Sequence, residues 1–287
     1  MYYGIIMLAV AMFGVCFACN DVYRAWRGSG LAVSLESSFF GSIAGLAVLL
    51  ASDGFSVACT PFTLLMALLA TLNGLAFTYC TLKALDVINL SLFSLFSMLG
   101  GMLLPFLQGI LFFHEPMTIA KAICLALIVL ALLLTVSRGE QKRGAIYYIG
   151  VFLLNGLAGV LSKLYTEAPY PKASPAGYSF WCAALTVLLA GVFWAVLAMR
   201  GHWPKGMTWR SCGLCAASGA VNRFANFLLV IALVHVDASV QYPMITGGVM
   251  IVSTLLCFFG NRKPNKRELL SVLLAFAGLL ALFVIPV

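Results

Sequence analysis

The sequence predicts an all-α membrane protein with ten transmembrane helices. Of its 287 residues, 63% are hydrophobic and only 9% are charged, and the mean hydropathy is +1.05. A soluble domain carries far more charge on its surface, whereas a helix that crosses the hydrocarbon core needs about 20 mostly apolar residues. The apolar residues fall into runs of this length, and segments such as 126–136 lack the strict alternation of a β-barrel strand.

Turn-like or charged segments separate the ten predicted spans. In chain order these separators are RAWRGSG, SDGFSVACTP, LDVIN, HEP, SRGEQKRG, EAPYPKASP, RGHWPKG, VHVD and NRKPNK. The predicted spans are residues 3–23, 31–51, 61–82, 88–113, 117–137, 145–165, 176–199, 210–233, 238–259 and 267–286. The connections after the third and eighth spans are so short that they predict tight antiparallel hairpins. The first span has no cleavable-signal pattern and is expected to be retained.

An internal repeat divides the chain into two five-helix halves, 1–140 and 141–287. Tyr2-Tyr3 and Gly14-Val15 recur as Tyr147-Tyr148 and Gly159-Val160, and Ala84-Leu85, Ser91, Gly100 and Pro116 recur as Ala232-Leu233, Ser239, Gly248 and Pro264. Because five is odd, the second half is expected to be inverted in the membrane relative to the first. Inverted repeats are typical of secondary transporters, whose binding sites lie between the halves.

The basic residues predict the orientation of the chain. The net charge is +8, but the basic residues lie between apolar runs and do not cluster with aromatic residues, which argues against nucleic-acid binding. The segments after odd-numbered spans hold Arg24, Arg27, Lys83, Arg138, Lys142, Arg143, Arg200, Lys205, Arg210, Arg262, Lys263, Lys266 and Arg267, and the alternate segments hold only Lys121, Lys163 and Lys172. The positive-inside rule then predicts both termini outside the cytoplasmic membrane.

The nine cysteines do not predict a metal or redox centre. Nearly all lie inside apolar runs, where cysteine behaves as a small hydrophobic residue. The pairs Cys16/Cys19 and Cys212/Cys215 have the C-x-x-C spacing but no nearby histidine to complete a metal site. We expect no cofactor and no catalytic residues, since the sequence contains no P-loop, H-E-x-x-H or G-x-S-x-G motif.

The first half contains a pattern found in a known family. The segment AFTYCTLKALDVINLSLFSLFSMLGGML is followed by FFHEPMTIAKAICLALIVLALLL, with Glu115-Pro116 in the short turn. Together with the size and the five-plus-five repeat, this resembles the ten-helix EamA-like branch of the drug/metabolite transporter superfamily. The resemblance covers essentially the whole chain, and it implies that fold and a transport function. The second half departs from the pattern, with Lys263 where a glutamate is expected.

Two charged residues inside predicted spans are candidate site residues. Glu36 lies about one and a half turns into the second span, where it is either a cation or proton-coupling site or the partner of Arg24 or Arg27. Arg223 lies more than ten residues into the eighth span and is flanked by Asn222 and Asn226, which share a helix face. We expect these three residues to bind a carboxylate, phosphate or other acceptor; the alternative is a structural pair of Arg223 with Glu36 or Asp237.

Further polar and aromatic residues extend the predicted substrate site. Asn73 and Asn155 are amides inside the third and sixth spans, and such amides also hold helices together. In the ninth span, Tyr242 belongs to a polar stripe with Ser239 and Thr246, and Gln241 lies beside it. Tyr79, Trp181 and Tyr242 are rings that suit an organic cation, although such rings also anchor membrane interfaces. Gly41–Gly45 (GSIAG) is expected to form a close helix contact.

These features favour a secondary transporter of a small polar or charged metabolite, such as an amino acid or related zwitterion, working by alternating access with optional proton coupling. The alternative solute is an organic cation or quaternary amine such as choline. Two other classes stay open, a lipid-carrier flippase and, with less support, a membrane-embedded enzyme. The expected partners are the solute and the lipid bilayer, not nucleic acid, and the chain is expected to be a monomer or weak homodimer.

Overall fold

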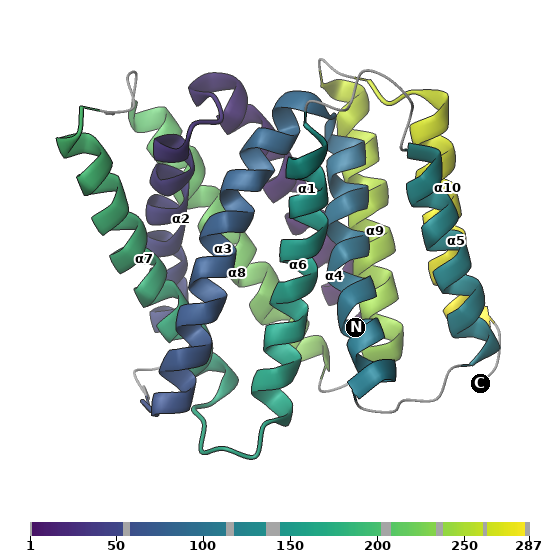
Figure 1. Cartoon of the computed structure of the whole chain (residues 1–287), viewed down its shortest axis with the longest axis horizontal. Helices are drawn as coiled ribbons and strands as arrows, with labels where there is room; N and C mark the ends of the chain where they lie inside the picture. The colour runs from purple at the N-terminus through teal and green to yellow at the C-terminus, as the bar shows by residue number, and fades with distance from the viewer. Residues whose placement is uncertain are drawn as a thin grey trace.

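The computed structural model has ten α-helices (Figure 1), and it describes residues 2–53, 58–112, 118–135, 144–201, 208–233, 238–260 and 263–284. The helices are α1 (Tyr2–Arg27), α2 (Leu31–Asp53), α3 (Pro61–Val87), α4 (Leu90–Phe112), α5 (Ile119–Thr135), α6 (Ala145–Glu167), α7 (Pro175–Met199), α8 (Trp209–Leu233), α9 (Ala238–Phe259) and α10 (Lys266–Val284). No strand occurs among these residues. The predicted all-α class is therefore confirmed.

The apolar character of the helices indicates a membrane-embedded protein. Five of them, α1, α2, α3, α6 and α7, are long and apolar enough to cross a membrane. Large apolar side chains such as Leu8, Leu157 and Leu188 are exposed on the outer faces of the helices. A water-soluble protein rarely exposes so much apolar surface, because its removal from water is strongly favourable.

The first helix ends later than the sequence predicts. It continues to Arg27 instead of residue 23, because the chain first leaves helical geometry at Gly28, which has φ of 85° and donates its N–H to the Arg24 carbonyl over 2.7 Å. Arg24 and Arg27 therefore lie in the last turn of α1 and not in a loop. Lys83 likewise lies inside α3. Charged residues mark the end of an apolar run, but they do not end a helix.

Two helices begin at a hydroxyl residue followed by proline. The Thr60 hydroxyl accepts the N–H of Thr63 over 3.2 Å at the start of α3, and the Ser174 hydroxyl accepts the N–H of Gly177 over 3.1 Å at the start of α7. Each hydroxyl accepts a backbone N–H that has no acceptor within the helix. Proline suits the first helical position because it has no N–H and therefore needs no acceptor there.

The helices of the two halves of the chain are interleaved. Helix α1 packs against α8 and α9, α2 against α7 and α8, α3 against α6 and α7, and α4 against α6 and α9. Helices α5 and α10 pair with each other at one edge of the molecule, and α7 lies at the opposite edge (Figure 1). The centre contains buried aromatic contacts, including Phe17 edge-on to Phe93 with ring centroids 5.0 Å apart.

Glycines allow the closest helix contacts. The backbones of Gly41 in α2 and Gly219 in α8 touch, and a Cβ on Gly219 would overlap the Gly41 carbonyl. A Cβ on Gly100 in α4 would overlap the Phe152 carbonyl of α6 in the same way. Small residues at these positions let helices approach far enough to gain dispersion energy, which is the main source of helix association in lipid.

We predict that Gly219→Val lowers the free energy of unfolding by about 1–3 kcal/mol, because the new side chain has to separate α2 from α8. Thermal unfolding of the purified protein in detergent measures the loss. Gly213→Val is the matched control on the same helix, since a Cβ there meets no atom within 4 Å. Equal stability of the two variants would contradict the close contact.

Candidate functional site

Glu36 forms a buried ion pair with Arg27. The Arg27 guanidinium donates through Nη2 to Glu36 Oε2 over 2.6 Å, and the two side chains are 3% and 0% exposed. Tyr23 lies beside the pair and donates its hydroxyl to the Val33 carbonyl over 3.1 Å. The second oxygen, Glu36 Oε1, is buried and has no hydrogen-bond partner among the described residues. Of the two partners considered from the sequence, the structure selects Arg27.

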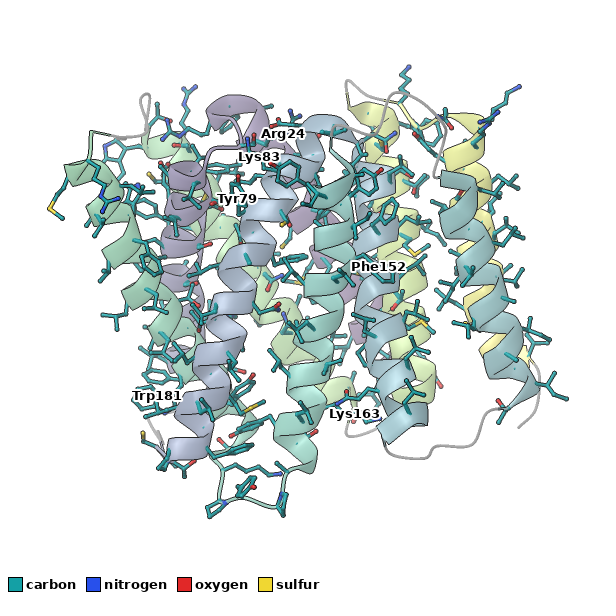
Figure 2. All side chains as sticks on the ribbon, in the orientation of Figure 1. Arg24, Tyr79, Lys83, Phe152, Lys163 and Trp181 are labelled. Atoms are coloured by element: carbon teal, nitrogen blue, oxygen red, sulfur yellow. The ribbon has the colours of Figure 1, made fainter. Side chains whose placement is uncertain are left out.

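Arg24 belongs to a separate polar network at the same end of the helices. It contacts Asp21 over 2.8 Å and Asp86 over 3.2 Å, and the Ser29 hydroxyl also donates to Asp86. Figure 2 shows Arg24 near Lys83, with Lys163 at the other end of the helices. This network joins α1 to α3, so the end at which α1 and α3 finish is held together by ionic contacts.

Arg223 lies in the middle of α8. It follows the start of the helix by 14 residues and precedes its end by 10, which correspond to about 21 Å and about 15 Å along the axis. The guanidinium is therefore too deep to reach either end of the helix. Its side chain crosses Gly45 of α2, where a Cβ would lie 2.6 Å from Arg223 Cγ and 3.3 Å from Nε. The Cys182 thiol of α7 lies within electrostatic reach of the guanidinium.

No described residue neutralises Arg223. Its half-buried side chain forms no hydrogen bond or ion pair with any residue that the structure describes. The predicted alternative partner Glu36 is bound to Arg27 instead, and Asp237 lies outside the described residues. A cation inside a membrane protein normally pairs with an acid or faces water, because desolvation without a partner costs several kcal/mol. Arg223 thus has donors and a charge, far from both ends of α8, that no described residue uses.

The four carboxylates whose side chains the structure describes all have other partners. Asp21 and Asp86 bind Arg24, and Glu36 binds Arg27. Glu268, which is 8% exposed, accepts from Asn89 over 2.6 Å and from the Asn265 backbone over 2.8 Å. The bond from Asn89, which the sequence did not reveal, joins the turn between α3 and α4 to the first turn of α10.

Asn222 and Asn226 bind each other and not Arg223. The Asn226 amide donates to the Asn222 carbonyl over 2.8 Å and to its side-chain oxygen over 3.2 Å. They share a helix face, as their spacing predicts, but Arg223 is rotated about 100° from Asn222 around the helix. Asn226 is exposed, so these two amides form a polar strip beside Arg223 without contacting its charge.

Asn73 and Asn155 connect helices. Asn73 donates to the Leu154 carbonyl of α6 over 2.9 Å, and Asn155 donates to the Ser97 carbonyl of α4 over 2.6 Å. Asn155 also lies over Gly101, where a Cβ would be 2.7 Å from its nitrogen. One acceptor stays unused, because the buried Oδ1 of Asn73 has no partner among the described residues. Both amides hold α6 in place, so they have the helix-connecting role that the sequence also suggested for them.

Tyr79 and Trp181 are far apart, so these two rings do not form one cage. Trp181 donates to the Ala58 carbonyl over 3.2 Å, just before α3 begins, whereas Tyr79 lies 18 residues into α3 and packs edge-on against Tyr147. Figure 2 shows them towards opposite ends of the helices. The side chains of Gln241 and Tyr242 lie outside the residues that the structure describes.

The surroundings of Arg223 include residues that sequence reasoning did not select. Thr71 of α3 donates its hydroxyl to the Cys182 carbonyl over 3.2 Å, and Thr186 donates to the same carbonyl over 2.7 Å. Cys182 directly follows Trp181, which the sequence suggested as a ring for an organic cation. Gly45 is the last residue of the GSIAG segment, which the sequence suggested as a close helix contact. Parts of α2, α3 and α7 thus meet near Arg223 of α8.

Comparison with known proteins adds evidence on the fold alone. No protein-family model and no curated protein matches the sequence. A solved structure described only as the crystal structure of a protein is similar over 96% of this chain and 94% of its own, with 18% sequence identity and a TM-score of 0.60. Identity this low carries the likeness of fold and nothing about activity.

Proposed function

We propose that this protein is a secondary transporter that moves a small polar or charged metabolite across the cytoplasmic membrane by alternating access. The observation that supports this most is Arg223, a half-buried guanidinium near the middle of α8 that no described residue neutralises. A membrane protein rarely keeps such a charge unless it faces a solute pathway. A solute held between helices of both halves suits a carrier better than an enzyme, for which the chain offers no recognisable catalytic motif.

The proposed architecture is ten membrane spans in two inverted halves, 1–140 and 141–287. Its support is a regularity in the most extensive helix contacts: replacing each helix by the one five later, or five earlier, converts each of these pairs into another pair that is also in contact or into itself. The pair α1–α8 becomes α6–α3, α1–α9 becomes α6–α4, and α2–α8 becomes α7–α3. A two-fold axis in the membrane plane would produce this pattern, as it does in transporters with inverted repeats.

Membership of the drug/metabolite transporter superfamily, in its EamA-like branch, is part of the same proposal and rests on the first-half sequence pattern. The orientation, with both termini outside, rests on the bias of basic residues. Arg24 and Lys83 share one end of the molecule (Figure 2), which agrees with one strongly basic face.

The test is solute uptake by purified protein in liposomes. A screen of labelled amino acids, carboxylic acids, sugars and choline should find at least one solute whose uptake saturates and exceeds that of protein-free liposomes. The same vesicles carrying a fluorescent phospholipid distinguish a flippase: protein-dependent lipid movement without any saturable solute uptake would overturn the proposal.

A further inference from the structure

We infer that Arg223 binds an oxyanion on the transported solute, so the solute is an acid or a zwitterion and not a simple cation; this rests on the proposed function. The guanidinium is a charge that no described residue neutralises; its stem packs against α2 of the first half, and α2 in turn packs against α3 and α7. Binding an anion would restore neutrality there. The positive charge of Arg223, which no described residue compensates, therefore favours a solute that carries a negative group.

The polar groups near Arg223 make it the principal donor. Thr71 and Thr186 both give their hydroxyl protons to the Cys182 carbonyl, so neither has a proton left for a solute. Arg223 has five N–H donors in a planar fork and forms no hydrogen bond with any described residue. That fork matches the two oxygens of a carboxylate, and equally those of a phosphate or sulfonate.

Gly45 supports anion binding by Arg223 because it leaves space for the arginine stem. The Cγ and Nε atoms of Arg223 rest where a side chain at position 45 would be. The stem is thereby held against α2, and the charge of the guanidinium acts on Cys182 of α7. An arginine held along its stem loses less rotamer freedom when it binds, which favours affinity.

A cationic solute fits the same position poorly. The four carboxylates whose side chains the structure describes contact Arg24, Arg27, Asn89 and Asn265, and none of them contacts Arg223, so no described carboxylate offers an ammonium group a partner there. Arg223 itself repels a cation, and the repulsion is strong where water is scarce. The quaternary-amine alternative therefore loses the acid on which it depended, because Glu36 is neutralised by Arg27.

The thiol of Cys182 allows the electrostatic effect of Arg223 to be measured directly. Cys182 can be labelled with two methanethiosulfonates of similar size, one carrying a sulfonate and one a quaternary ammonium, and its modification followed by peptide mass spectrometry. The ratio of anionic to cationic labelling rates should fall at least fivefold in Arg223→Gln, since a nearby charge attracts one reagent and repels the other. Cys59, an exposed thiol, serves as the internal reference and should keep its ratio.

A second arm uses the wild-type protein alone and does not depend on the variant folding. Uncharged N-ethylmaleimide labels Cys182 in the presence of L-glutamate, phosphate or choline, and in micelles with or without phosphatidylglycerol. Protection by glutamate or phosphate supports a soluble anion; protection only by phosphatidylglycerol assigns the oxyanion to a lipid headgroup and overturns the solute.

An unchanged labelling ratio together with no protection by any anion would overturn the anion site. Anion protection without uptake in liposomes would keep the site and reject the transport function. The two failures are therefore distinguishable.

Discussion

Glu36→Gln is expected to lower the free energy of unfolding by about 3–5 kcal/mol. The substitution leaves the Arg27 guanidinium, 3% exposed, without its charged partner at 2.6 Å. A buried charge that loses its counter-ion keeps its desolvation cost and loses the attraction that offset it. Chemical or thermal unfolding in detergent measures the loss, and the double variant Arg27→Met/Glu36→Leu should recover much of it because no unpaired charge remains.

Asp21→Asn is the matched control for this experiment. Asp21 also contacts an arginine, but its side chain is 37% exposed and Arg24 keeps its second partner Asp86. Exposed pairs contribute about 0–1 kcal/mol, so this variant should be nearly as stable as the wild type. If Glu36→Gln were equally stable and instead only removed a dependence of uptake on the pH gradient, Glu36 would be a proton-coupling residue and not a structural one.

Arg223→Gln is expected to reduce the initial rate of saturable uptake at least tenfold while leaving the protein folded. The neutral amide cannot compensate an anion, and losing a charge-assisted hydrogen bond to a buried group costs about 1.5–3 kcal/mol, or more when two bonds are lost. Arg223→Lys should be intermediate, because lysine keeps the charge but not the planar fork. Uptake in liposomes, normalised to the amount of monodisperse protein, gives the rates.

Arg210→Gln is the control for Arg223. It removes the same charge from the same helix, but Arg210 is exposed near the helix start. An uptake rate close to that of the wild type is expected for this variant. Equal losses in both variants would mean that the overall charge of the protein matters and would remove Arg223 from the site.

The sequence predicted the helices well because their signal is local. Long apolar runs and the breakers between them locate all ten helices with limits that differ by five residues or fewer. The largest differences arise where polar residues continue a helix, as at Arg27 and Lys83. Glycine with positive φ, as at Gly28, marks the end of α1 more accurately than the charges that precede it.

The candidate site was only partly predictable, because a sequence does not say which helices touch. Glu36 and Arg223 were selected as charges inside spans, but their different surroundings depend on packing. Glu36 meets Arg27, whereas the stem of Arg223 packs against Gly45. Asn73 and Asn155 illustrate the same point. Their positions inside spans were evident from the sequence, but their acceptors were not, because the backbone carbonyls that they bind belong to helices far away in the sequence.

Trans-stimulation is the measurement that tests the central claim most directly, namely that one site containing Arg223 is exposed alternately to the two sides of the membrane. Liposomes preloaded with an unlabelled acidic solute should take up the same labelled solute several times faster than empty liposomes, and Arg223→Gln should lose this acceleration. Uptake by the wild type that does not saturate and does not respond to the internal solute would contradict the account.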